Sequence, residues 1–124
     1  MQDEHSLMDR KISFSWLLSF YGSLLTENQQ QISRLYAEED FSLSEIAEQF
    51  GVSRQSVYDT VTRTEKQLLD FEKKLGLRAR FDRTEQVLTE CQKLLARVNA
   101  TQETEKYLAK VRSSIHHLLE EEEQ

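Results

Sequence analysis

The sequence predicts an all-α protein. Its 124 residues include no proline and only three glycines, so residues that break helices are scarce. Good helix formers such as Glu, Gln, Leu and Lys are abundant, and apolar residues recur every three or four positions. Because a chain of this length buries one modest core, we expect one domain in residues 1–80 and a helical extension in residues 81–124.

The first two helices are predicted from apolar spacing and from a cap. Thr26 followed by Gln29 has the spacing of a capping box, in which two side chains satisfy backbone N–H groups at the start of a helix. That helix is expected to end near Glu38. Before it, residues 7–25 are expected to form an amphipathic helix, whose apolar face comprises Leu7, Met8, Ile12, Trp16, Leu17, Phe20, Tyr21, Leu24 and Leu25.

A short helix and a long helix are expected next. Ser42 or Ser44 can cap the short helix, because a serine side chain accepts a hydrogen bond from the unpaired N–H groups of a first turn. The short helix should stop at Gly51, since glycine is the usual residue after a helix end. Ser53 is expected to cap the long helix, which spans residues 54–75.

Two further helices complete the predicted fold. Gly76 is expected to end the long helix, and residues 99–101 separate the fifth helix from the sixth. Both have the alternating spacing of a coiled-coil seam, and the seams could pair with each other or with a second copy in a homodimer. An acidic tail, residues 120–123, is expected to fray. The seam residues are Val87, Leu88, Cys91, Leu94, Leu95, Val98, Leu108, Val111, Ile115 and Leu118.

The stretch from Leu43 to Tyr58 has the pattern of a helix-turn-helix. This motif needs a small residue where its two helices cross, a residue that tolerates positive φ in the turn, and apolar groups facing inward. Ala47, Gly51 and Val57 meet these demands in that order. We therefore predict a helix-turn-helix, of the winged-helix-like class, that binds double-stranded DNA. The alternative for the same pattern is a purely structural corner.

The first turn of the long helix is the predicted reading surface, because this part of a recognition helix reaches base edges in the major groove. Arg54 can pair with guanine or hold a phosphate, and Gln55 can pair with adenine. Ser56 and Tyr58 can donate hydrogen bonds to phosphate oxygens or base edges.

The next turns of the same helix are predicted to contact the DNA backbone. Arg63 and Lys66 are the better phosphate candidates, and Thr62 lies near them. Asp59 would repel phosphate unless it accepts from a cytosine amino group or pairs with Arg63 four residues later, and we favour the pair with Arg63. The predicted DNA-binding residues are Ser53, Arg54, Gln55, Ser56, Tyr58, Asp59, Thr62, Arg63 and Lys66.

The overall charge of the chain opposes DNA binding. The net charge is −6 and the isoelectric point is near 5.1, whereas phosphate contact normally requires a basic surface. Residues 51–83 differ from the rest, with eight Lys or Arg against five Asp or Glu. The predicted recognition helix lies in this basic segment, so we expect DNA binding of modest affinity.

Four stretches of the sequence carry a resemblance to a known family: Phe20–Thr26, Tyr36–Phe50, Val52–Asp59 and Arg63–Glu65. They look like the YlxM family of small bacterial helix-turn-helix proteins, and the resemblance covers residues 14–95. It implies a helix-turn-helix similar to region 4 of bacterial sigma factors. The chain lacks any other promoter-reading region of a sigma factor, so it could not direct transcription initiation alone.

The genes of the YlxM family commonly lie beside those of the signal recognition particle. The resemblance therefore implies a DNA-binding regulatory protein, or an accessory factor, linked to that secretion pathway. An adaptor that contacts the particle's protein or RNA without binding DNA is the alternative. The region from Thr101 onward resembles the family least clearly, so the pairing of the last helix stays open.

No residue pattern predicts catalysis, a cofactor or a metal site. Cys91 lies on an apolar seam, where a thiol is buried and inert. His116 and His117 point about 100° apart on a helix and cannot bind one metal together. The start of the chain lacks the basic segment of a secretory signal, and no apolar run is long enough to span a bilayer. We expect a non-enzymatic, cytoplasmic protein.

Overall fold

The computed structural model describes residues 4–122, and within this range the all-α prediction is confirmed. The same range contains no β-strand, so the expected winged-helix-like class is wrong, because a wing is a β-hairpin. None of the helices described is long and apolar enough to cross a membrane. The elements are α1 (Glu4–Tyr21), the 3₁₀ helix η1 (Gly22–Leu24), α2 (Glu27–Ala37), α3 (Leu43–Phe50), α4 (Arg54–Leu75), α5 (Leu77–Ala96) and α6 (Gln102–Glu122).

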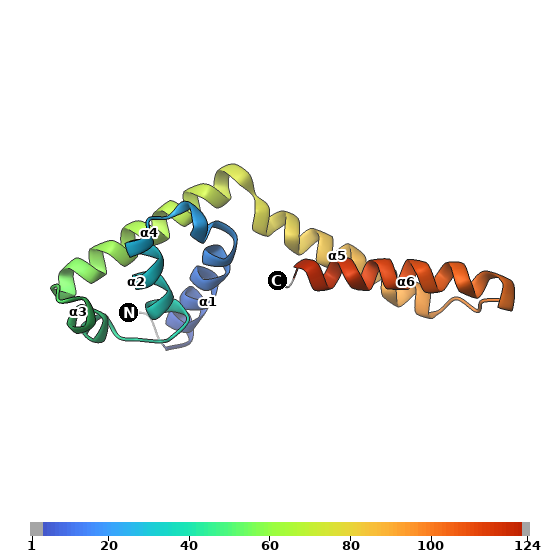
Figure 1. The fold of residues 1–124 in the computed structure, drawn as a ribbon, viewed down its shortest axis with the longest axis horizontal. Helices are drawn as coiled ribbons and strands as arrows, with labels where there is room; N and C mark the ends of the chain where they lie inside the picture. The colour runs from blue at the N-terminus through green and yellow to red at the C-terminus, as the bar shows by residue number, and fades with distance from the viewer. Residues whose placement is uncertain (1–3, 123–124) are drawn as a thin grey trace. The chain divides into compact units, whose positions relative to one another are not determined.

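The chain forms two compact units that divide between Arg78 and Ala79. Unit 1 contains α1 to α4, and Figure 1 shows these helices gathered around a common centre. Ile46, Val57 and Leu68 are 0% exposed there and belong to one continuous hydrophobic core. Unit 2 contains α6 and nearly all of α5.

The starts of α2 and α3 follow the caps in the sequence. The Thr26 Oγ1 accepts from the Gln29 N–H at 3.2 Å, and the Gln29 side chain accepts from the Thr26 N–H at 3.2 Å. Ser42, and not Ser44, caps α3 through reciprocal 3.0 Å bonds with Glu45. The Ser42 N–H that donates to the Glu45 carboxylate lowers the pKa of that group. Both predicted capping positions are therefore occupied by hydrogen-bonded caps.

The buried face of α1 agrees with the predicted face only at Leu17 and Tyr21. Apolar residues surround this helix without a preferred side, so their spacing cannot single out the face that is buried. Phe14, Leu17, Leu18 and Tyr21 are the residues that enter the core. The helix also ends at Tyr21, earlier than expected, where η1 begins. The predicted core residues that are exposed instead are Leu7, Met8, Ile12, Trp16 and Leu24.

Tyr21 ties α1 to the junction of α4 and α5. Its hydroxyl donates to the Glu72 Oε1 at 2.6 Å and accepts from the Leu77 N–H at 3.0 Å. The same Glu72 oxygen accepts from the Arg78 N–H at 3.0 Å. The first N–H groups of a helix have no partner within the helix, so this pair caps α5. Gly76, at φ +62°, ends α4 as predicted.

Unit 2 is an antiparallel pair of long helices, in which α6 runs back along α5 (Figure 1). α5 begins at Leu77, well before the first predicted seam residue, Val87. Among the side chains of α6 whose burial is described, Ile115 is the most buried, at 9% exposure. Residues 120–122 belong to α6 and do not form a separate tail, and residue 123 lies outside the described residues.

Candidate nucleic-acid interface

The corner between α3 and α4 has the geometry predicted for a helix-turn-helix. Gly51 adopts φ +66°, and its N–H donates to the Glu48 carbonyl at 3.4 Å. The Val52 N–H donates to the Ala47 carbonyl at 3.0 Å, which completes a Schellman ending of α3. Ala47 is 6% exposed and Val57 is fully buried. The three roles predicted for the corner are confirmed.

The predicted reading surface is exposed along α4. The Ser53 Oγ accepts from the Ser56 N–H at 3.0 Å, so Ser53 caps the helix as expected. The buried side chains of α4 occupy one face of it. At about 100° per residue, Gln55, Asp59 and Lys66 lie opposite that face. Every residue predicted to bind DNA is exposed: Ser53, Arg54, Gln55, Ser56, Tyr58, Asp59, Thr62, Arg63 and Lys66.

Asp59 has a different partner from the predicted one. The Gln55 Nε2 donates to the Asp59 Oδ1 at 3.0 Å, so the favoured pair between Asp59 and Arg63 is wrong. Side chains on a helix lean toward its N-terminus, which brings Asp59 to the residue one turn before it. Arg63 is consequently available to another acceptor, and the charge of Asp59 stays on the exposed face.

A residue that the sequence analysis missed lies beside the reading surface. Arg10, from α1, forms a 2.9 Å ion pair with Glu65 of α4, and the hydrogen bond to Glu65 raises the pKa of Arg10. The two residues are 55 positions apart, and no local pattern connects them. The pair partly neutralises a carboxylate on the helix proposed to face DNA. It lines a hollow of about 140 Å³ together with Tyr36, Leu43, Tyr58, Val61 and Thr62.

The electrostatics of this surface are mixed. Among the described residues, Arg54, Arg63 and Lys66 form no ion pair, so all three cations can contact phosphate. Asp59 is the opposing charge among the predicted DNA-binding residues. The hydroxyls of Ser56 and Tyr58 add neutral donors. The surface can therefore contact both phosphates and base edges, with a small excess of positive charge.

A left-handed glycine corner between two helices, followed by a capped and exposed helix, defines a helix-turn-helix protein. A sequence model of a family described as "Putative helix-turn-helix protein, YlxM / p13 like" matches residues 8–111. The chain belongs to this family, UPF0122. The match extends beyond residues 14–95 and includes the first part of α6.

Similar proteins from several bacteria share most of this chain. A UPF0122 protein of Halalkalibacterium halodurans is 48% identical over 82 residues, which cover 66% of this chain and 75% of the relative. One from Desulforamulus reducens is 51% identical over 79 residues, covering 64% and 68%. One from Geobacillus kaustophilus is 40% identical over 91 residues, covering 73% and 83%. Stretches of this length must include the middle of the chain wherever they begin. The similarity therefore covers the corner and the reading surface of α4.

Proposed function

We propose that this protein binds double-stranded DNA in the cytoplasm and acts as a non-enzymatic regulatory protein linked to the signal recognition particle pathway. The first turns of α4 enter the major groove. The observation that supports this most strongly is the start of α4, which is capped by Ser53 and follows a left-handed glycine corner. Helices presented in this way place their first turns against base edges.

The bond between Gln55 and Asp59 is compatible with reading adenine. A glutamine amide has two N–H donors and one carbonyl acceptor. One N–H donates to Asp59 at 3.0 Å, so the second N–H and the carbonyl stay available. Adenine presents one acceptor and one donor in the major groove, which these two groups match. Asp59 then orients the amide of Gln55 and need not compete with the base.

The position of each other side chain along α4 decides whether it contacts bases or phosphates. Arg54 lies in the first turn, where it can reach guanine or a phosphate. Arg63 and Lys66 lie further along and contact phosphates. With three free cations per chain, the logarithm of the binding constant should fall with the logarithm of salt at a slope of about −3 per chain.

The test begins with selection of duplexes from a random pool at low salt, followed by fluorescence anisotropy on the selected site. Arg54→Ala and Gln55→Ala should lower affinity for that site and relax the preference at one position each. Arg63→Ala and Lys66→Ala should weaken binding to all sequences alike. Lys93→Ala removes the same charge from α5 and serves as the matched control. Unchanged binding by all four α4 variants would exclude this surface as the reading surface.

A second candidate function is an adaptor that contacts the protein or RNA of the signal recognition particle. The net charge of −6 and the exposed apolar side chains of unit 2 favour it. A pull-down with the purified particle protein and its RNA tests this directly. Recovery of either, combined with no binding to any duplex at about 50 mM salt, would favour the adaptor over the DNA-binding protein.

A further inference from the structure

α5 carries two adjacent apolar seams. Leu88 and Leu95, with Cys91 between them, are partly buried and form the first seam. Val87 and Leu94 form the second, and they remain 61% and 54% exposed. A helix that pairs with one neighbour needs a single seam, whereas a helix in a bundle needs a wider apolar face because it contacts two neighbours. α5 has the face of a bundle helix.

α6 has the same arrangement. Leu108 and Ile115 are its partly buried and buried seam residues. Tyr107, Val111 and Leu118 form a second seam and are 60%, 44% and 47% exposed. Each helix of unit 2 therefore uses one seam within the pair and leaves the other to solvent.

The two exposed seams lie on the same side of the helix pair. At 100° per residue, each exposed seam is displaced from its buried seam by about 80°, in the same rotational sense along both helices. Because α5 and α6 run antiparallel, an equal displacement in the same sense brings both exposed seams to one side. Unit 2 thus presents a single apolar face built from two helices.

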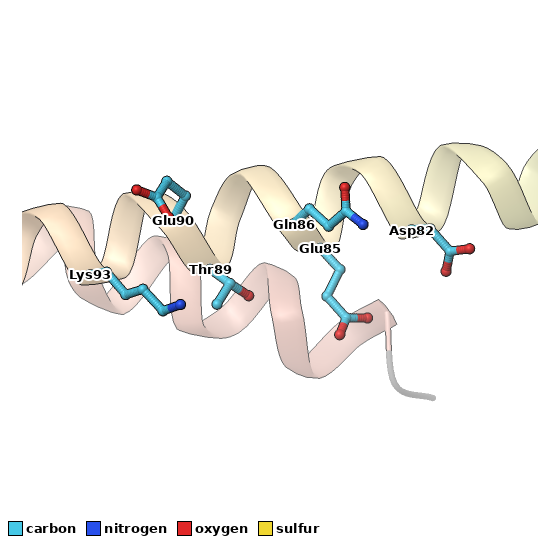
Figure 2. A pocket seen from close by; sticks show the side chains of 6 residues that line it. All are labelled: Asp82, Glu85, Gln86, Thr89, Glu90 and Lys93. Carbon is cyan, nitrogen blue, oxygen red and sulfur yellow. The ribbon is translucent and has the colours of Figure 1, made fainter.

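Another side of α5 carries polar side chains. Figure 2 shows side chains that project from α5 around a hollow of about 510 Å³. Three of these side chains are acidic and one is basic, and this acidic excess would repel phosphate. The contrast indicates that the apolar face, and not this hollow, is built for contact. The residues lining the hollow are Asp82, Glu85, Gln86, Thr89, Glu90 and Lys93.

We infer that the apolar face of unit 2 packs against the same face of a second copy of this chain, so that two chains form a four-helix bundle. The face is about 27 Å long and about 20 Å wide for two adjacent helices. Two such faces cover roughly 1,100 Å² in total, which passes the roughly 1,000 Å² that a biological interface should exceed. The fold supplies only two of the helices that such a bundle needs, and an identical face completes it.

Charges beside the apolar face select the partner helix. The edge of α5 and the turn after it carry charges seven residues apart, at Arg83, Glu90 and Arg97. At matching distances from the loop, the corresponding edge of α6 carries His117, Lys110 and Glu103. His117 also contacts Glu121 at 3.4 Å. The charges are therefore opposite for Arg97 and Glu103, which lie nearest the loop, and for Glu90 and Lys110, which lie at the middle. At the third position, Glu121 lies near His117 and is opposite in charge to Arg83.

This complementarity distinguishes two symmetric arrangements. If α5 lies on α6 of the other copy, Arg97 faces the partner's Glu103 and Glu90 faces the partner's Lys110. If α5 lies on α5 of the other copy, Glu90 faces the partner's Glu90, and like charges oppose each other. The charges therefore favour the first arrangement, in which α5 lies on α6 of the other copy. All neighbouring helices then run antiparallel, and both loops lie at the same end of the bundle.

The bundle extends the proposed function without depending on it. Unit 1 joins α5 at the end opposite the loop, so both copies of unit 1 leave the bundle from one end. A dimer carries two recognition helices, which doubles the number of cations that can meet one duplex. The salt slope should then double, to between about −5 and −6 for the dimer. Association of the chains is measured without DNA, so failure of DNA binding and failure of the dimer are distinguishable.

Sedimentation of the full chain over a dilution series tests the bundle. The expected mass is twice that of one 14.6 kDa chain. Val87→Glu with Leu94→Glu should give a single-chain mass, and circular dichroism should show unchanged helix content because both side chains are exposed in one chain. Gln86→Glu with Lys93→Glu introduces two glutamates on the polar side of α5 instead, and this control variant should leave the dimer intact. A wild-type chain that sediments at 14.6 kDa at every concentration overturns the inference, as does a seam variant that sediments like the wild type.

A charge exchange tests the arrangement within the bundle. Arg83→Glu with Arg97→Glu makes the α5 edge acidic, and Glu103→Lys with Glu121→Lys makes the α6 edge basic. Each variant alone should dimerise with a dissociation constant at least about tenfold higher, because like charges then face each other. An equimolar mixture should form heterodimers with affinity close to that of the wild type. If the first variant dimerises as tightly as the wild type, α5 does not lie on the partner's α6.

Discussion

The two units of this chain bury apolar side chains to very different extents. Unit 1 encloses eleven buried hydrophobic residues, ten from four helices and Leu25 from the connection between η1 and α2. In the part of unit 2 that the structure describes, only Phe81 and Ile115 are comparably buried, at 7% and 9% exposure. Four helices can surround a core on all sides, whereas two helices can cover only the seam between them. The same apolar periodicity therefore produces a closed core in one unit and an open face in the other.

This difference separates two proposed tasks. The core of unit 1 includes Ala47 and Val57 of the corner, which fixes the geometry of the corner and of the proposed recognition helix. Unit 2 has apolar surface left over, which suits contact with a second chain. Measurements that affect one unit and spare the other can break or sharpen this comparison.

The largest effect is expected from Leu68→Ala in the core of unit 1. Leu68 is 0% exposed, so its truncation leaves a cavity and should lower the free energy of unfolding by about 3 kcal/mol. Trp16 is the only tryptophan and lies in α1, so its fluorescence during urea unfolding reports on unit 1. Leu88→Ala, in unit 2, should leave that midpoint unchanged. An equal shift for both variants would show that the two units unfold as one.

The second largest effect on the free energy of unfolding is expected from Tyr21→Phe. The change removes the hydroxyl that donates to Glu72 at 2.6 Å and accepts from the Leu77 N–H. Both groups then lose a partner in a partly buried site, which should lower the free energy of unfolding by about 2 kcal/mol. The Trp16 midpoint in urea measures this loss. An unchanged midpoint would mean that water replaces the hydroxyl at no cost.

The same variant also has a pH signature. Burial raises the pKa of Tyr21 in the folded chain, and the hydrogen bond with Glu72 adds to this. A raised pKa contributes stability that is fully present below the unfolded value of about 10 and is lost as pH rises through the folded value. The free energy of unfolding should therefore fall above about pH 10 more steeply for the wild type than for Tyr21→Phe. Parallel pH profiles would contradict this assignment.

A smaller effect is expected from Ser42→Ala, which removes the cap of α3. The lost bond from the Glu45 N–H should cost about 1 kcal/mol, again measured by the Trp16 midpoint. Ser113→Ala is the matched change in unit 2, on an exposed position within α6. It removes no cap and should not lower stability, since alanine favours helices. A similar loss from both variants would mean that the cap of α3 contributes nothing specific.

The smallest effect is expected from Asp59→Asn. It removes the negative charge from the reading surface and keeps an oxygen that can accept from Gln55. Affinity for duplex DNA should rise about threefold at low salt, and the gain should shrink as salt is added, because exposed charges are screened. Asp82→Asn makes the same change in unit 2 and should have no effect. A gain from Asp82→Asn would place DNA against unit 2 as well.

Most of the fold could be predicted because its signals are local. The caps at Thr26 and Ser53 and the corner at Gly51 each depend on residues only a few positions apart, and the structure confirms them. The bounds of α4 were predictable for the same reason, because a cap and a glycine enclose it. Less of the candidate site could be predicted. The sequence indicated which residues project from α4 but not the hydrogen bond between Gln55 and Asp59.

Sequence alone determined where α2 and α4 begin and end, which helix follows the glycine corner, and that apolar surface recurs at helical spacing. Only the tertiary structure decided which face of α1 is buried, that Arg10 meets Glu65, and that one seam on each helix of unit 2 stays exposed. The physical reason is the distance along the sequence between the residues that interact. Caps and turns are decided by neighbours along the chain, whereas burial and ion pairing are decided by which helices pack together.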